Sequence, residues 1–139
     1  MGKITTALTV INHADEVRAR DGTISADQVR MVTLDDVLVD TGATALCLPH
    51  RIIAQLGLNP VREVAASTAN GYSRVQIYED AKISLLGREG AFECLELPGG
   101  DQALLGIIPL EAMGIEPDFA NQTLRLLPTE GRDTYITVF

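Results

Sequence analysis

The chain has 139 residues, of which 46% are hydrophobic and 22% are charged, and its formal net charge at pH 7 is -8. This length favours one compact domain with enough chain to bury a core. No apolar run approaches the roughly 20 residues of a membrane-spanning helix, so we expect no membrane association. The few basic residues are scattered through an acidic chain, which argues against nucleic acid as a partner.

The first eleven residues lack the long apolar stretch and the small-residue cleavage site of a signal peptide. We therefore expect a cytoplasmic protein. The two cysteines, Cys47 and Cys94, fit this expectation, because cysteines in a reducing compartment are more often buried thiols than partners in a disulfide.

The first third of the chain predicts two β segments separated by a polar excursion. Lys3–Ile11 is rich in β-branched residues that alternate with polar ones, which indicates a strand. Asn12–Gln28 is charged and carries an Asp-Gly turn signal, so we expect a solvated loop with one helical turn at Ala14–Ala19. Extended structure resumes at Val29–Thr33.

A continuous apolar run, Val37-Leu38-Val39, comes next and is typical of a strand buried on both faces. The acidic pair before it, Asp35 and Asp36, is interpreted as a solvated turn. The buried strand ends at Asp40.

The remainder predicts hairpins and two short helices. A second apolar run at Leu46–Leu48 precedes a helix that starts at Pro49 and stops at Gly57, and a matching helix runs from Pro109 to Gly114. The loop 98–101 leads into the apolar segment Ala103–Ile107 before that second helix. The other β segments are Val61–Ser67, Tyr72–Leu86, Ala91–Leu97, Asn121–Leu127 and Thr134–Phe139, with turns at 68–71 and 87–90.

These segments predict an all-β fold, a closed β-barrel with one or two short helices. We expect a single domain over residues 1–139 with its core in 29–128.

An acidic residue directly after a buried strand must have a stabilising partner or a function, because burying an ionised carboxylate without partners costs several kcal/mol of stability. A turn-capping role would suffice for Asp40 if Asp40-Thr41-Gly42 stood alone. The surrounding residues favour a different interpretation.

The segment Leu38-Val39-Asp40-Thr41-Gly42-Ala43-Thr44 resembles the signature of the aspartic peptidases. Leu104-Leu105-Gly106 before a short helix is similar to the second element of that family, which runs alongside the catalytic loop. With the hairpins between them, the resemblance covers residues 34–128 and is to the single-lobed, retropepsin-like aspartic peptidases, of the bacterial type similar to retroviral proteases.

The resemblance implies a role for each residue of the loop. Asp40 is the catalytic acid and base, and Thr41 hydrogen-bonds to the loop of a partner subunit. Gly42 lets the backbone approach the carboxylate. Ala43 lacks the hydroxyl that the two-lobed, pepsin-like enzymes often have there, and Thr44 replaces the Asp of many retroviral enzymes. Leu104, Leu105 and Gly106 support the loop.

The family's mobile flap corresponds to the hairpin whose tip holds Asn70, Gly71 and Tyr72, with Asn70-Gly71 making the turn. Tyr72 or Tyr78 could cover a substrate, although a Tyr in a hairpin more often packs across strands.

Peptide hydrolysis by this mechanism needs two carboxyl groups that share one proton, and the chain has one such Asp. We therefore expect a homodimer, an aspartic endopeptidase that acts on a peptide or protein substrate and needs no cofactor. The interface is expected to use the terminal strands, residues 3–11 and 134–139.

Two alternatives remain beside this hypothesis, and one of them is a domain that is cut from, or acts on, a larger partner. A module of the same fold could dimerise and bind an extended peptide without cutting it. A Cys47 nucleophile with His50 is disfavoured because Cys47 lies in an apolar run, and no metal site is expected because His and Cys lack ligand spacing.

Overall fold

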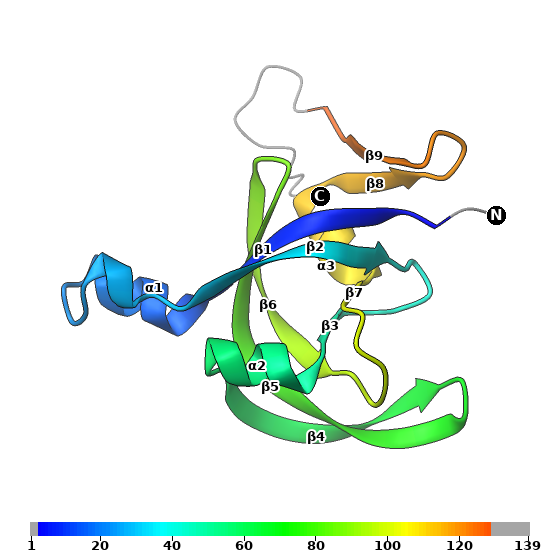
Figure 1. The fold of residues 1–139 in the computed structure, drawn as a ribbon. Helices are drawn as coiled ribbons and strands as arrows, with labels where there is room; N and C mark the ends of the chain where they lie inside the picture. The colour runs from blue at the N-terminus through cyan, green and yellow to red at the C-terminus, as the bar shows by residue number, and fades with distance from the viewer. Residues whose placement is uncertain (1–2, 129–139) are drawn as a thin grey trace, which may run out of the picture.

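The computed structural model describes residues 3–128, and its main feature is one strongly curled sheet of seven strands (Figure 1). The strand order is β1-β2-β7-β3-β6-β5-β4, and β1 also pairs with β5, so the sheet curls back on itself. A separate two-stranded sheet contains β8 and β9. The strands are β1 Thr5–Asn12, β2 Met31–Val39, β3 Leu46–Leu48, β4 Asn59–Thr68, β5 Gly71–Leu85, β6 Arg88–Glu96, β7 Leu104–Leu105, β8 Ile115–Asp118 and β9 Thr123–Leu126.

Three α-helices and a single 3-10 turn complete the described chain: α1 His13–Arg20, η1 Ala26–Gln28, α2 His50–Leu56 and α3 Ile107–Met113. Figure 1 shows α1 projecting beyond the sheet, while α2 packs near β2 and α3 packs against β6 and β8. None of the helices within residues 3–128 is long and apolar enough to cross a membrane. The predicted mostly β fold with short helices is confirmed; full closure into a barrel and the homodimer stay predictions.

The core lies inside the curl of the sheet and is built by strand alternation. Leu46 and Leu48 are fully buried while Cys47 between them is partly exposed, because neighbouring residues of a strand point to opposite faces. Leu56 and Leu110, from α2 and α3, are buried in the same cluster as the strand residues. Both helices therefore pack on the sheet through apolar side chains.

Both short helices end as predicted, at glycines in the left-handed conformation: Gly57 has φ 64° and Gly114 has φ 65°. Their starts differ from the prediction. Pro49 is the N-cap of α2, one residue before the first helical position, and α3 begins at Ile107 so that Pro109 lies inside its first turn. Proline is tolerated there because the first-turn amides have no partner within the helix.

The excursion after β1 contains the predicted helical turn at Ala14–Ala19 but is more ordered than predicted. Residues 13–20 form a full helix whose first turn is capped by the Asn12 side chain, which accepts from the amide of Asp15 at 3.0 Å. The Asp15 side chain is buried, and Arg30 donates to it through Nε at 2.8 Å and Nη2 at 3.0 Å. This ion pair ties the excursion to the start of β2.

The interpretation of Asp35 and Asp36 as a turn is wrong. Both lie within β2, Met31–Val39, where its register with β1 shifts: Leu34 lies opposite Leu8 and Val37 opposite Thr6, and the two acidic residues fall between these pairs. Their side chains are exposed, and the paired residues on either side keep the strand extended there without burying the charges. Leu38 is also only partly buried, so the end of β2 is not buried on both faces as expected.

The β5–β6 turn is shifted relative to the prediction, and one strand was not predicted. The β5–β6 turn is Leu86-Gly87, and β6 already begins at Arg88. Residues 115–118 form β8 despite containing Pro117, because they pair with β9 in a sheet of only two strands, where a missing donor is tolerated. The predicted terminal strand 134–139 lies outside the described residues.

Candidate active site at the end of strand β2

Asp40 directly follows β2, and backbone hydrogen bonds on both sides fix its position. Its amide donates to the carbonyl oxygen of Leu105 at 3.0 Å, and its own carbonyl oxygen accepts from the amide of Ala43 at 3.0 Å. The carboxylate oxygen Oδ1 accepts from the amide of Gly42 at 2.9 Å. The loop therefore folds around the half-buried carboxylate and sets its orientation.

Gly42 lies close to the carboxylate that it binds. A Cβ added at Gly42 would lie 3.2 Å from Oδ1 of Asp40, closer than most Cβ contacts. A side chain there would press that oxygen a few tenths of an ångström away, so glycine leaves the carboxylate in its present orientation.

Strand β7 holds the Asp40 loop from behind. It runs between β2 and β3. It is parallel to β2, with Leu104 opposite Leu38, and antiparallel to β3, with Leu105 opposite Leu46. The chain then turns into α3, and three consecutive amides donate to the Asp40 loop: Gly106 to Ala45 at 3.0 Å, Ile107 to Ala43 at 2.9 Å and Ile108 to Thr44 at 3.0 Å. The supporting element predicted at 104–106 thus lies beside the loop.

Gly106 occupies a position that admits no side chain. A Cβ there would lie 2.5 Å from the carbonyl oxygen of Ala45 and 2.6 Å from that of Ala43. Both are backbone atoms of the Asp40 loop, so neither can rotate away. The close packing of two backbone segments depends on this glycine.

The Asp40 loop opens onto a groove of about 780 Å³ between itself and the β4–β5 hairpin. Apart from Asp40 and Glu96, the groove is lined by small, mostly apolar residues. They are Gly42, Ala43, Thr44, Ala45 and Cys47 on the loop side, 65–69 and Val75 on the hairpin, and 95–99 with Leu104 on the remaining wall. The sequence analysis missed the hairpin side chains, the 95–99 wall and Cys47.

The predicted flap residues lie at the far tip of the hairpin rather than along the groove. The two-residue turn is Ala69-Asn70, since Thr68 pairs with Gly71, and Thr68 Oγ1 donates to the carbonyl oxygen of Gly71 at 2.7 Å. Tyr72 is 82% exposed and does not line the groove. The hairpin residues that line the groove are instead 65–68 of β4, Ala69 of the turn and Val75 of β5.

Tyr78 and His50 both bind Glu96, at the end of β6. Tyr78 donates to Oε1 of Glu96 at 2.8 Å, and Nδ1 of His50 lies 3.1 Å from the same oxygen. Burial, then the bond to Glu96, raises the pKa of Tyr78 to about 12. Tyr78 is therefore a packed cross-strand residue with a fixed hydroxyl, and His50 is engaged away from Cys47.

Cys47 is the groove residue that a nucleophilic mechanism would use, and its environment argues against it. Burial, followed by the negative charge of Asp40, raises the pKa of the Cys47 thiol to about 11. At neutral pH the thiol stays protonated, and the thiolate is the reactive form. Within residues 3–128, no group of three or more His, Cys, Asp or Glu side chains is placed to hold a metal ion.

The chain matches the family described as gag-polyprotein putative aspartyl protease over residues 21–111. This range contains both the Asp40 loop and Gly106. The chain belongs to this retropepsin-like aspartic protease family. Its fold is similar to that of EIAV protease, solved in complex with the inhibitor HBY-793, with a TM-score of 0.54 and 19% sequence identity.

That fold similarity covers 81% of this chain and 89% of the EIAV protease chain. None of the curated protein sequences is significantly similar to this chain. The family match ends inside α3, so β8 and β9 lie beyond it. In this retropepsin-like chain, the family match therefore covers the Asp40 loop and the Gly106 element but not the hairpin of β8 and β9.

Proposed function

We propose that this protein is an aspartic endopeptidase that acts as a homodimer. The observation that supports it best is the position of Asp40, whose carboxylate is oriented by the Gly42 amide at the wall of a groove. The family and the fold support the same reaction class, hydrolysis of a peptide bond.

The proposed mechanism uses two Asp40 carboxyl groups, one from each subunit. Two carboxyls about 3 Å apart share one proton, because both cannot be ionised at that separation. The ionised group takes a proton from a water molecule as it attacks the peptide carbonyl, and the protonated group donates to the carbonyl oxygen. The other groove carboxylate, Glu96, is held by Tyr78 and His50, so it is a poor substitute for a second Asp40.

The groove suits an extended peptide. Its walls are small or apolar, with Ala65 and Ala66 on the hairpin and Leu95 and Leu104 opposite. Such walls leave room for substrate side chains, and strands at the rim offer main-chain groups to a peptide that lies extended.

The dimer is required by the chemistry rather than observed. Thr41 and Gly42 are exposed in the single chain, as a contact with a second copy beside Asp40 requires. We propose that the Thr41 hydroxyl hydrogen-bonds to the partner's loop and holds the two carboxylates coplanar.

The test compares the wild type with Asp40→Asn on a mixed peptide library between pH 4 and 7. The variant should lose cleavage while its circular dichroism and sedimentation stay unchanged, because the amide cannot share the proton. Asp35→Asn is the matched control, since it removes the same charge from an exposed position on β2 outside the groove. It should cleave at the wild-type rate.

A transition-state mimic of the statine type, whose hydroxyl replaces the attacking water, should inhibit the wild type. Cleavage by pure Asp40→Asn at the wild-type rate would refute the mechanism. A wild type that binds peptides, cuts none and ignores the mimic would instead support the non-catalytic, peptide-binding module.

A further inference from the structure

The wall of the groove at residues 97–99 belongs to a loop that the sheet holds only at its two ends. The amide of Leu97 donates to the carbonyl oxygen of Leu48 at 2.9 Å, and the carbonyl oxygen of Ala103 accepts from the amide of Leu38 at 2.9 Å. Between these anchors residues 98–102 are exposed, and Gly100 has φ 81°. We call this segment the wall loop, residues 97–103.

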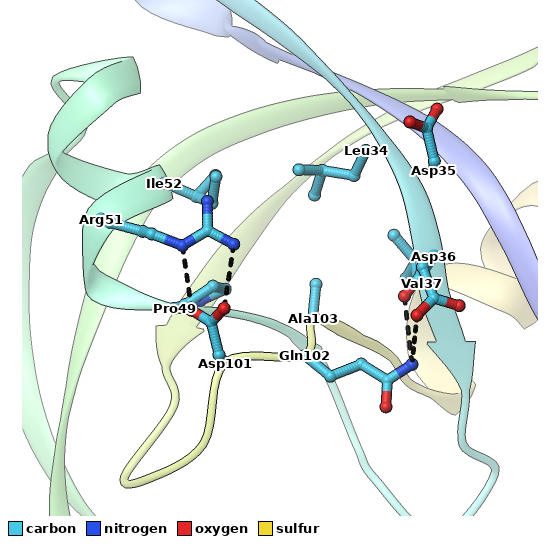
Figure 2. A pocket seen from close by; sticks show the side chains of 10 residues that line it. All are labelled: Leu34, Asp35, Asp36, Val37, Pro49, Arg51, Ile52, Asp101, Gln102 and Ala103. Atoms are coloured by element: carbon cyan, nitrogen blue, oxygen red, sulfur yellow. Dashed lines mark hydrogen bonds and ion pairs between the residues drawn. The ribbon is translucent and has the colours of Figure 1, made fainter.

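A second cleft of about 370 Å³ lies behind the wall loop (Figure 2). Its base is apolar, with Leu34 and Val37 from β2 and Ile52 from α2, and its rim includes Asp101 and Gln102 of the loop itself. The wall loop thus runs between the groove on one side and this outer cleft on the other. Because a cleft lies behind the loop at residues 101–103, contacts that cross this cleft must help to set the position of the loop.

Two side-chain bridges cross the outer cleft and provide those contacts. Arg51, at the start of α2, donates to Asp101 through Nε at 2.9 Å and through Nη2 at 3.3 Å. Gln102 Nε2 donates to the carbonyl oxygen of Asp36 on β2 at 3.1 Å. Figure 2 shows both bridges reaching from the loop to the rim of the cleft.

We propose that Arg51 and Asp101 are positioning residues for the peptidase, because their ion pair holds the wall loop against α2 and so fixes one wall of the substrate groove. The inference rests on the proposed function. The pair is exposed and contributes little to global stability. A loop whose backbone is held only at its ends opens locally at low cost, so one bidentate contact within it makes the loop more ordered.

A wall that is ordered before substrate arrives lowers the entropy lost on binding, whereas a loose wall must be ordered by the substrate. The effect should therefore fall on KM and not on kcat, since neither residue reaches the groove where Asp40 acts. We expect KM to rise roughly three- to tenfold when the pair is broken.

The experiment uses the full chain with three variants: Arg51→Gln, Asp101→Asn and the charge-swapped double variant Arg51→Asp/Asp101→Arg. KM and kcat are measured on one peptide, and hydrogen exchange is followed in the free protein at the two bonded amides that anchor the loop, Leu97 to Leu48 and Leu38 to Ala103. Both single variants should show raised KM, kcat within about twofold of the wild type and faster loop exchange. The double variant should recover toward the wild type in KM and in exchange.

Arg20→Gln is the matched control, because Arg20 is also an exposed arginine near a carboxylate, that of Glu16, on a helix outside the groove. It should change neither KM nor loop exchange. Loop exchange that is unchanged in both single variants would overturn the inference, and so would faster exchange with KM unchanged. A wild type that cuts no peptide would refute the proposed function, and with it the kinetic role, while the exchange data still decide whether the pair orders the loop.

Discussion

Gly106→Ala is the substitution for which the structure makes the sharpest prediction. The added methyl would lie 2.5 to 2.6 Å from three backbone atoms of Ala45 and Ala43. Gly106 has φ -89° and ψ -174°, a conformation open to any residue, so backbone strain plays no part. The whole effect should come from pushing α3 and the Asp40 loop apart.

The magnitude follows from the contacts that must give way. Overpacking a filled site costs typically about 1–3 kcal/mol. Separation of the segments also weakens the hydrogen bonds from Gly106, Ile107 and Ile108, each of which contributes about 0.5–1.5 kcal/mol. Alanine restricts the unfolded chain and returns about 0.4–1 kcal/mol. We expect the free energy of unfolding to fall by about 2–4 kcal/mol, and Tm by roughly 6–15 °C.

Urea denaturation at fixed protein concentration measures this loss, with the concentration held constant because a dimer gains stability by mass action. Gly99→Ala is the control, since a Cβ there meets nothing within 4 Å and its φ is not positive. It should stay within about 0.5 kcal/mol of the wild type. A Gly106→Ala protein with an unchanged urea midpoint would show that the two segments can separate freely, and the account of the loop would be wrong.

Three further predictions follow from the ion pair, the groove thiol and the terminus. Arg30→Met removes the bidentate partner of the buried Asp15 carboxylate, which keeps only the backbone amide of residue 30 at 3.1 Å and Arg18 at 3.8 Å, and should cost about 2 kcal/mol at pH 7. The hydrogen bond from Arg30 is the main cause that lowers the pKa of Asp15. The stability that the pair contributes is therefore complete above the usual pKa of 3.8 and is lost as the pH falls below that value. Urea titrations that gave the same difference in stability between wild type and variant at pH 7 and at pH 2.5 would contradict this. Iodoacetamide should label Cys47 slowly at pH 8, and Asp40→Asn should speed labelling by about two- to tenfold, because removal of the neighbouring charge lowers the pKa of the thiol. Mass spectrometry measures the labelling rate, and equal rates in the wild type and in Asp40→Asn would contradict this prediction. Deletion of residues 134–139 should give an inactive monomer, and a truncated protein that sediments as a dimer and still cleaves would refute the terminal-strand interface.

The sequence was most informative where one residue type satisfies a local backbone demand. Gly57 and Gly114 end helices in the left-handed conformation, which only a few residue types adopt readily, so both helix ends could be predicted. Gly42 was predicted from the family resemblance, and in the structure its amide donates to the Asp40 carboxylate.

Sequence patterns failed where long-range contacts decide the structure. In the polar segment 12–28 only one helical turn, at Ala14–Ala19, was predicted, and the full helix 13–20 also depends on Arg30, which pairs with Asp15 from a distant part of the chain. Asp35 and Asp36 are extended because β1 pairs with the β2 residues on both sides of them, on either side of a register shift. The hairpin side of the groove was missed because alanines in a strand give no chemical signal, and only the fold brings residues 65–69 opposite Asp40.

The pairing of β1 constrains how two copies of the proposed dimer could meet. β1 pairs with β2 from Thr5 onward and with β5 from Thr9 to Asn12, and its side chains Leu8 and Val10 are buried in the subunit's own core. Only the backbone edge before Thr9 is left for the predicted interface, because a strand with neighbours on both sides has no free hydrogen-bonding edge. A two-fold axis that brings two Asp40 carboxyls together must also pass beside Thr41 and Gly42, which are exposed. In the proposed dimer the contact between the two loops therefore sets the geometry of the two Asp40 carboxyls. The terminal strands add the buried area that stabilises the dimer.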